Sequence, residues 1–473
     1  MRAFFVFAVL VISINSFSQQ VQFQQNIGWK GAGNSISLQS FTNADESLVC
    51  LAVLRYDSLK AFLLDKNMKL RTITGVYVAP DEEFLGGFVS DNKISFLFNK
   101  THDKQVFNWI YNIDSNSFES YLIPFDLKGK KTLGHIGVGN FYYITAEKRE
   151  PVINVFEFKT NGSIDQQNYD LSNAGTQHFD RNELWQALSK TAGIGSRDVD
   201  ISVVQTEADC SIADANAPNK IYCRNDTLLL LMDNQIGSTQ IFSFDLSRKK
   251  IDYKSIERQG IASVNDVIAD QCVYNSFLSE DNLYYVFADE KSLSLVINSF
   301  SDGKEMARFS AGREEEIAFK NTPILQDGGG TIYSANAKRE LDKTKQFLKK
   351  LLAGRAVITA YRNQYNQCEI TVGAYKQMQS TSGGWSSFGG GAPVYTGGIS
   401  SSWKRVTRFK SIIDTKTLEH ISGEIKPSLS DIINDYTTNI DIPSKGERLF
   451  SLQNNFFYAY YDKSDKSLKV VKL

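Results

Sequence analysis

The side chains that most often carry catalysis or bind metals are few in this chain of 473 residues. Its four histidines are His102, His135, His178 and His420, and none lies in an HExxH motif or a close pair. Metal sites built from histidine need imidazoles at a spacing that brings them to one ion. The sequence therefore predicts no metal site and no cofactor.

Carboxylates occur in two short runs, Asp81-Glu-Glu83 and Glu314-Glu-Glu316. Two facing carboxylates can act as the acid and the base of a glycoside hydrolase, although such runs are more often solvated turns. No P-loop, dinucleotide-binding glycine motif or complete EF-hand occurs,. The segment from Gly384 to Phe388 departs from the G-x-S-x-G motif at its last position,. The sequence thus leaves the catalytic residues unknown.

The five cysteines include no CxxC motif. Cys210 and Cys223 are near enough in sequence to close a small loop, so they form either a disulfide or two separate thiols,. Cys50, Cys272 and Cys368 lie within apolar strand patterns, where a buried thiol is expected,.

The elements that would position any site follow from a repeated cell of eight residues. A polar turn residue opens each copy, a buried strand follows, and an acid or amide closes it, as in Asn282–Asp289 and Asn455–Asp462. The other copies are Asn140–Glu147, Asp226–Asp233 and Asn92–Asn99. Strands rich in aromatic and β-branched residues surround each cell, and each group of four strands forms one repeat.

The spacing of these cells predicts a β-propeller. The shortest steps between them are about 50 residues, which is the length of one four-stranded blade,. Counting the cells and the groups around them predicts seven blades. The last group ends one strand short, and Val21–Ile27 could complete it, so we expect the N-terminal strand to close the ring,. Two stacked β-sandwiches are the rival fold.

Four segments exceed the repeat, at residues 172–220, 311–355, 377–404 and 422–447. Strand direction reverses at every connection, which places all four on the same face of a propeller. Three of these segments are expected to contain helices. Segment 172–220 has a short helix through Trp185, segment 311–355 an amphipathic helix over Lys338–Ala353, and segment 422–447 one or two helical turns from Ser428,. The remaining segment, 377–404, is rich in Gly and Ser,.

Aromatic side chains within the insertions are the candidate ligand-binding residues. They are Trp185, Trp385, Phe388, Tyr395 and Trp403. Aromatic rings on a contact loop can stack on sugars or peptide side chains. The alternative is that these rings pin their loops onto the propeller.

Residues 1–18 resemble a secretory signal peptide in having a positive start, an apolar core and small residues before Gln19,. Residues 19–473 are then expected to form a single exported domain, periplasmic or extracellular, without a transmembrane segment. The balance of 52 Lys and Arg against 53 Asp and Glu disfavours nucleic acid as a partner,.

These observations predict a secreted or periplasmic, non-catalytic β-propeller that binds a protein, peptide or glycan through the insertions on one face. One alternative is a glycan hydrolase or lyase with acidic residues at the central channel. The other is an envelope scaffold protein.

Overall fold

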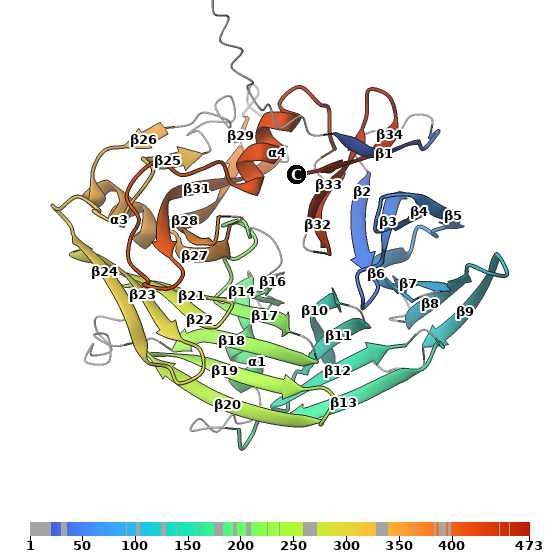
Figure 1. Ribbon diagram of the computed structural model, residues 1–473. Helices are drawn as coiled ribbons and strands as arrows, with labels where there is room; N and C mark the ends of the chain where they lie inside the picture. Colours follow the sequence, from blue (N-terminus) through green and yellow to red (C-terminus); the bar gives the residue numbers. More distant parts are fainter. Residues whose placement is uncertain are drawn as a thin grey trace, which may run out of the picture.

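Apolar and aromatic runs fold most of the described part of this chain into β-strands, nearly all of them antiparallel (Figure 1),. The structure, a computed structural model, describes residues 20–29, 36–90, 92–100, 105–123, 129–138, 140–159, 161–174, 183–192, 196–204, 210–224, 226–235, 237–258, 272–327, 339–363, 365–382, 385–386, 394–395, 399–443, 445–453 and 455–473. Within these residues the strands form seven sheets of four or five strands, numbered here 1 to 7 along the chain. The all-β prediction is confirmed.

The first three sheets are simple meanders in which each strand pairs with the next. Sheet 1 contains β2 (Ser37–Thr42), β3 (Leu48–Arg55), β4 (Ser58–Asp65) and β5 (Leu70–Tyr77). Sheet 2 contains β6 (Glu82–Val89), β7 (Lys93–Lys100), β8 (Gln105–Asn112) and β9 (Ser117–Ile123). Sheet 3 contains β10 (Lys130–Val138), β11 (Asn140–Glu147), β12 (Val152–Phe158) and β13 (Ile164–Asp170).

Sheets 4 and 5 continue this pattern, with one added strand. Sheet 4 contains β17 (Asn219–Arg224), β18 (Thr227–Gln235), β19 (Ser238–Asp245), β20 (Lys250–Glu257) and an extra inner strand, β16 (Ile201–Val204). This extra strand comes from the first insertion and runs parallel to β17. Sheet 5 contains β21 (Val273–Ser279), β22 (Asn282–Ala288), β23 (Ser292–Ser299) and β24 (Glu305–Gly312).

Sheet 6 differs from the prediction in the origin of its outer strands. It contains β27 (Arg355–Arg362), β28 (Gln367–Ser382), β31 (Ile399–Asp414), β25 (Ile324–Asp327) and β26 (Arg339–Leu341), paired in the order 26-25-31-28-27. The four-strand repeat places the fourth strand directly after β31, at residues 417–421, but this segment forms only a single bridge, Ile413 with His420. The prediction was wrong because β25 pairs with the edge of β31, and Asn321 and Thr322 hydrogen-bond the same edge at Ile412 and Lys410.

Sheet 7 confirms the predicted pairing of the two ends of the chain. It contains β32 (Glu447–Leu452), β33 (Asn455–Asp462), β34 (Ser467–Lys472) and β1 (Val21–Asn26). Strand β1 pairs antiparallel with β34, from Val21 opposite Val471 to Asn26 opposite Ser467. The N-terminal strand therefore completes the last sheet, as the missing fourth strand had indicated.

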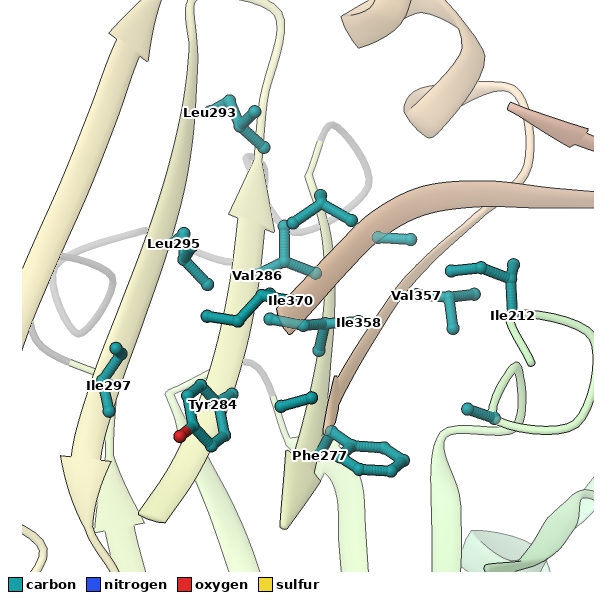
Figure 2. Close-up of a cluster of buried hydrophobic side chains, with 14 of the residues drawn as sticks. Ile212, Phe277, Tyr284, Val286, Leu293, Leu295, Ile297, Val357, Ile358 and Ile370 are labelled. Atoms are coloured by element: carbon teal, nitrogen blue, oxygen red, sulfur yellow. The ribbon is translucent and has the colours of Figure 1, made fainter. Parts of the chain in front are cut away.

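Figure 1 shows the sheets following one another around a common middle, in a β-propeller-like arrangement. The first strand of a sheet lies toward the middle and the last toward the rim, as β6 and β9 show. Apolar side chains fill the layers between successive sheets. Figure 2 shows one layer, in which Tyr284 and Val286 of sheet 5 meet Ile358 and Ile370 of sheet 6.

The helices lie in the predicted insertions. Helix α1 spans Glu183–Leu188, α3 spans Thr344–Leu352 and α4 spans Leu429–Thr437. The predicted start of α3 at Lys338 was too early, because Arg339–Leu341 forms strand β26 instead. Ser428 caps α4 through a capping box with Asp431,.

Two short sheets complete the described structure. The first pairs β14 (Ser189–Ala192) with β15 (Ser196–Val199), and the second pairs β29 (Trp385–Ser386) with β30 (Val394–Tyr395). Among the helices that the structure describes, none has the length and apolar character needed to cross a bilayer.

Candidate functional site

The boundary between sheets 2 and 3 brings ionisable side chains together from two neighbouring strands. Strands β6 and β10 begin their sheets, and each has a register shift near its start, between Phe84 and Gly86 and between Thr132 and Gly134. An extra residue in one strand of a pair changes the direction in which nearby side chains point. A Cβ on Gly86 would lie 2.8 Å from the ring of Phe141, so glycine there allows sheet 2 to approach sheet 3,.

His135 lies on the face of sheet 3 that packs against sheet 2. It is directly opposite Tyr143 of β11, and its ring stacks on Phe141 with 5.6 Å between ring centroids. The side chain is exposed, yet the surrounding protein removes enough water that desolvation lowers the pKa of His135 below 6.5, against an opposing effect of Glu83,. The imidazole is therefore neutral at pH 7 and able to accept a proton.

Glu83 faces this histidine's sheet from the start of β6. The two other acids of its run have partners of their own, since Asp81 pairs with Lys100 at 3.9 Å and Glu82 accepts a hydrogen bond from the Ala79 amide at 3.0 Å. Glu83 is exposed, and its opposite neighbour Asn99 shares the face toward sheet 3. Its negative charge raises the pKa of His135 and that of Tyr143.

Two hydroxyls complete the group. The Thr132 Oγ1 and Tyr143 phenol oxygens lie 2.5 Å apart, with Thr132 exposed and Tyr143 buried. Burial raises the pKa of Tyr143, while its bond with Thr132 acts in the opposite direction. The phenol therefore stays protonated at neutral pH and can hold the threonine hydroxyl in place.

We refer to Glu83, Thr132, His135 and Tyr143 as the inner polar cluster. It combines a neutral imidazole, a carboxylate and a hydroxyl pair at a position open to solvent. These are the groups that general acid–base catalysis uses. Sequence reasoning considered His135 and the run at Asp81–Glu83 separately, and it missed their convergence. The signal available was that both fall in the first strand of successive repeats.

The aromatic residues predicted to bind a ligand are not brought together in the described structure. Trp185 lies in α1 and is 8% exposed, packed with Leu184 and Leu188 into the apolar layer between sheets 3 and 4. Its local pattern is the buried side of an amphipathic helix. The backbones of Trp385 and Tyr395 pair opposite each other in β29 and β30.

The other four aromatic residues predicted to bind a ligand have side chains that the structure does not describe. Trp403 belongs to β31, but the structure describes only its backbone, as for Trp385 and Tyr395. Phe388 lies outside the described residues altogether. For these four rings, a role in ligand binding stays a prediction.

Of the two alternatives left open for Cys210 and Cys223, the structure shows two separate thiols and no disulfide. The reason is that they contact different layers. Cys223 belongs to the apolar layer between sheets 3 and 4, whereas Cys210 packs against the layer on the opposite side of sheet 4. Cys50, Cys272 and Cys368 are buried thiols, as predicted.

The second acidic run forms turns rather than a catalytic pair. Glu314 pairs with Lys345 at 3.2 Å, Glu315 accepts a hydrogen bond from the Gly312 amide, and Glu316 pairs with Lys320. Each carboxylate thus meets a partner close to it. No group of three or more His, Cys, Asp or Glu suited to a metal occurs among the residues that the structure describes.

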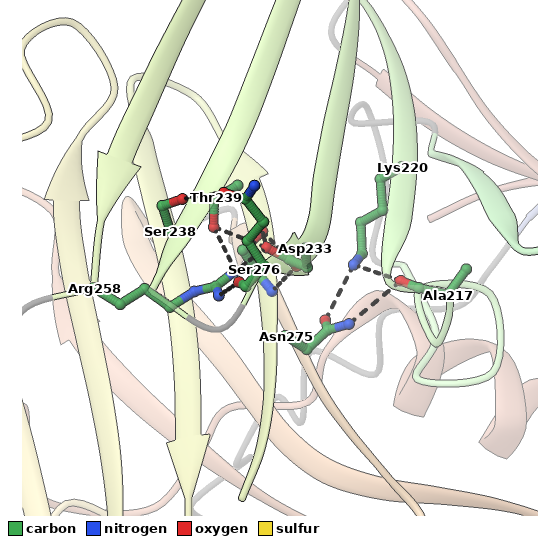
Figure 3. Close-up of polar contacts among 9 residues, drawn as sticks. Ala217, Lys220, Asp233, Ser238, Thr239, Arg258, Asn275 and Ser276 are labelled. Atoms are coloured by element: carbon green, nitrogen blue, oxygen red, sulfur yellow. Dashed lines mark hydrogen bonds and ion pairs between the residues drawn. The ribbon is translucent and has the colours of Figure 1, made fainter. Parts of the chain in front are cut away.

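A second polar cluster lies between sheets 4 and 5 (Figure 3), and its residues Asp233, Arg258 and Ser276 are buried. Asp233 of β18 pairs with Arg258 and accepts hydrogen bonds from Thr239 and from both the amide and the hydroxyl of Ser276. Burial alone would raise the pKa of Asp233, but Arg258, Lys220 and these donors outweigh it and lower the pKa. The Arg258 guanidinium also lies 4.4 Å above the ring of Tyr274,.

Lys220 extends this buried cluster, which we call the clasp. Its Nζ donates to the carbonyl of Ala217 at 2.8 Å and to Asn275 at 3.1 Å (Figure 3). Desolvation lowers the pKa of Lys220 to about 8. Asp233 and Arg258 are each 1% exposed as side chains, so a substrate has no access to them. The clasp therefore joins two sheets and is not a reaction site.

A small cavity between sheets 3 and 4 offers no ligand site. Its volume is about 10 Å³, and apolar side chains such as Leu133, Ile153 and Phe244 line it. That is close to the smallest space that holds one water, and the lining supplies no polar partner.

Comparison with known proteins gives no family for this chain. No family model matches it, and no curated protein matches it. Solved structures that it resembles include a cobalt-substituted apocarotenoid oxygenase from Synechocystis, with 8% identity and a TM-score of 0.30. This chain is covered over 60% of its length and that chain over 63%.

A chimera of the same oxygenase with RPE65 gives similar values, with 9% identity, a TM-score of 0.30, and coverage of 59% of this chain and 63% of that chain. The chain thus spans less than two thirds of the structures it matches. The predicted non-catalytic binding protein finds no counterpart among these matches, which are oxygenases. A TM-score near 0.3 carries no argument about the reaction of this chain.

Proposed function

We propose that this chain is an enzyme that uses general acid–base catalysis at the inner polar cluster. The observation that carries the proposal is the convergence of His135 and Glu83 from the first strands of neighbouring sheets, with the imidazole neutral yet open to solvent. A residue with a perturbed pKa beside a charged partner at a solvent-facing position is a candidate for catalysis.

The roles follow from the protonation states. Neutral His135 accepts a proton from a substrate or an attacking water, and Glu83 stabilises the imidazolium that forms. Thr132, held by the protonated Tyr143, offers a hydroxyl on the exposed side. A hydrolysis or elimination on a polar substrate fits these groups, since both reactions need a proton removed and returned.

The test is a turnover screen with chromogenic ester, amide and glycoside substrates. We expect wild-type protein to turn over one class, and His135→Gln to lose about 100-fold or more of that rate. His420→Gln is the matched control, because His420 is bonded to Asn321 on sheet 6 and belongs to no such cluster among the described residues. Equal rates for wild type and His135→Gln on the substrate found would contradict the proposal.

We further propose that the seven sheets form one closed β-propeller in a single domain of residues 19–473. Pairing of β1 with β34, and packing of Phe23 and Trp29 against sheet 1, support closure at this boundary. Removal of residues 20–26 leaves the edge of β34 open and should cause association between copies, measured by light scattering.

We also propose export to the periplasm or the exterior, with cleavage before Gln19. The pattern of residues 1–18 supports this, as does the position of β1 directly after the cleavage site. N-terminal sequencing of the protein recovered from the periplasm or the medium tests it, with Gln19 as the expected first residue.

A further inference from the structure

Strand β9 forms the outer edge of sheet 2, and it differs from other rim strands in how much of it is exposed (Figure 1). Within the described residues, β9 pairs with β8 on one side and no strand pairs with its other side. Every residue from Ser117 to Leu122 is exposed. In β5, β13, β20 and β24, the outer strands of sheets 1, 3, 4 and 5, no two successive residues are exposed. The edge of sheet 2 is therefore more open than these four.

One face of β9 carries apolar side chains that sheet 1 leaves uncovered. Phe118 packs on Trp109 and Tyr111 of β8, with ring centroids 6.3 and 5.0 Å apart. Leu122 lies on the same face, because side chains alternate along a strand. Sheet 1 reaches this face at β8, where the hydroxyls of Thr72 and Tyr111 lie 3.3 Å apart. Beyond that contact, Phe118 is 38% exposed and Leu122 is 52% exposed.

The opposite face of β9 carries the one charged side chain of the strand, Glu119. Its carboxylate accepts a hydrogen bond from the Tyr121 phenol at 2.7 Å. Exposed charges along an edge strand oppose pairing with another chain. The outer strand of sheet 4 has three of them, Lys250, Asp252 and Glu257. Strand β9 therefore has little protection against pairing through its open edge.

The sequence of β9 fits an antiparallel copy of itself in one register. The N–H and C=O groups of alternate residues point out from an edge, so two facing residues must point the same way with respect to it. A two-fold axis between two copies therefore passes through a residue, and an axis at Ser120 allows all seven residues of β9 to pair. An axis at Glu119 would place two carboxylates opposite each other, which is destabilising. An axis at Tyr121 would pair residues 119–123 alone.

In the register centred on Ser120, the facing side chains complement one another. Phe118 lies opposite Leu122 of the second copy, so an apolar pair forms on each side of the axis. Glu119 lies opposite Tyr121 of the second copy, which repeats the acceptor and donor that bond within one strand. Like charges do not face each other, and opposite pairs of these kinds stabilise a sheet.

We propose that β9 pairs antiparallel with β9 of a second copy of this chain, which joins two copies of sheet 2 into one continuous sheet. The contacts are the same in both directions, as an isologous interface requires. Main-chain hydrogen bonds along the strand and burial of Phe118 and Leu122 stabilise the dimer. Glu83 lies on β6, at the opposite edge of sheet 2. The pairing therefore leaves the inner polar cluster open and does not depend on the proposed catalysis.

The first experiment measures the mass of the full chain by sedimentation velocity over a range of concentrations. We expect a dimer that dissociates on dilution. Leu122→Lys introduces a charge against Phe118 of the second copy and should weaken the dimer about tenfold or more. Met306→Lys, in β24, is the matched control, because Met306 is also 52% exposed on an outer strand. It should change the dissociation constant by less than about twofold.

Thermal unfolding at concentrations where every variant is monomeric checks the fold. Leu122→Lys and Met306→Lys should both keep the wild-type midpoint, because both side chains are largely exposed,. A dimer that the two variants weaken equally would overturn the proposal. A chain that is monomeric at every concentration would overturn the second copy as the occupant and leave the edge to an extended segment of another protein.

Cysteine cross-linking tests the register independently of affinity. Side chains directly opposite in an antiparallel pair lie close enough for a disulfide, so Ser120→Cys should form a covalent dimer with oxidised glutathione. Ser310→Cys, at an exposed serine of β24, is the control for random collision, and the wild type gives the background from its own thiols. Equal cross-linking of these two variants, or preferential cross-linking of Glu119→Cys, would overturn pairing about Ser120.

Discussion

Two boundaries between sheets carry an acid and a base, and they differ in what surrounds them. At the clasp between sheets 4 and 5, Asp233 and Arg258 are 1% exposed, and Thr239 and Ser276 donate further hydrogen bonds. At the inner polar cluster between sheets 2 and 3, Glu83 and His135 are exposed to solvent. In the first arrangement the protein supplies most of the hydrogen-bond partners, and the second is left open to a substrate.

The difference shows that polar clusters at the boundary between two sheets can have two roles, stabilising the fold or carrying out chemistry. A buried charge is tolerated only when other groups meet nearly all its hydrogen-bonding capacity, which leaves none for chemistry. An exposed pair is worth little to stability, so it can change its protonation state at a small cost to the fold. The two clusters should therefore respond in opposite ways to substitution.

The largest effect is expected at the clasp. Asp233→Asn leaves the Arg258 charge buried without its counter-charge and should lower the free energy of unfolding by about 4 kcal/mol,. Urea unfolding followed by tryptophan fluorescence measures this. Asp57→Asn, at the surface pair with Arg55, is the control and should leave the free energy of unfolding nearly unchanged,. Equal costs for the two variants would remove the distinction drawn here between a saturated and an open pair.

An apolar boundary gives the next largest effect and a reference for the clasp. Phe23 of β1 packs on Phe62 of sheet 1, with ring centroids 6.2 Å apart. Phe23→Ala should cost about 3 kcal/mol through lost burial and the cavity left behind. Val21→Ala, in the same strand but 40% exposed, should cost less than about 0.5 kcal/mol,. Similar small values for both would mean that β1 contributes little to the fold.

Lys220 tests whether every member of the clasp adds stability. Its folded-state pKa of about 8 lies below the ordinary 10.5, so the folded protein binds this proton less tightly than the unfolded chain. Stability from this group is lowest below pH 8 and rises as the pH increases from 8 to 10.5. Lys220→Met should remove that rise and gain about 1 kcal/mol at pH 7.

The difference between wild type and Lys220→Met, measured by urea unfolding at several pH values, isolates this residue from other groups that titrate in the same range. Asn275 and the Ala217 carbonyl lose a donor in the variant, which limits the gain. A loss of stability at pH 7 would mean that these hydrogen bonds outweigh the burial of the charge.

Local patterns in the sequence were enough to predict most strands and the pairing of the two chain ends. The cell Asn455–Asp462 became β33, and Val21–Ile27 supplied β1. Both depend on alternation along a strand, which neighbouring residues determine. The prediction for sheet 6 was wrong in part, because β25 pairs with β31, which lies about 80 residues further along the chain,.

The candidate site was not predictable in the same way. His135 and Glu83 lie in different repeats, and only the packing of sheet 2 on sheet 3 brings them together. Trp185 was chosen for its ring, but the spacing of Leu184 and Leu188 around it already matched a buried helix face. Selecting candidates by residue type alone therefore favoured Trp185, which is part of the core, over His135, whose partner Glu83 comes from another sheet.

The smallest effect concerns the inner polar cluster and tests its open pair directly. Glu83 raises the pKa of His135, so Glu83→Gln should lower that pKa further,. Because the folded-state pKa of His135 is below 6.5, the folded protein loses stability as the pH falls from about 6.5 toward that pKa, and Glu83→Gln should deepen that loss,.

NMR titration of the histidine ring protons measures the pKa shift, with His420 as the internal reference and Glu82→Gln as the control. Glu82→Gln is a suitable control because the Glu82 carboxylate is bonded to the Ala79 amide, so this variant should leave the pKa of His135 unchanged. An unchanged His135 pKa in Glu83→Gln would mean that the two groups do not act on each other, and the contrast with the clasp would then rest on exposure alone.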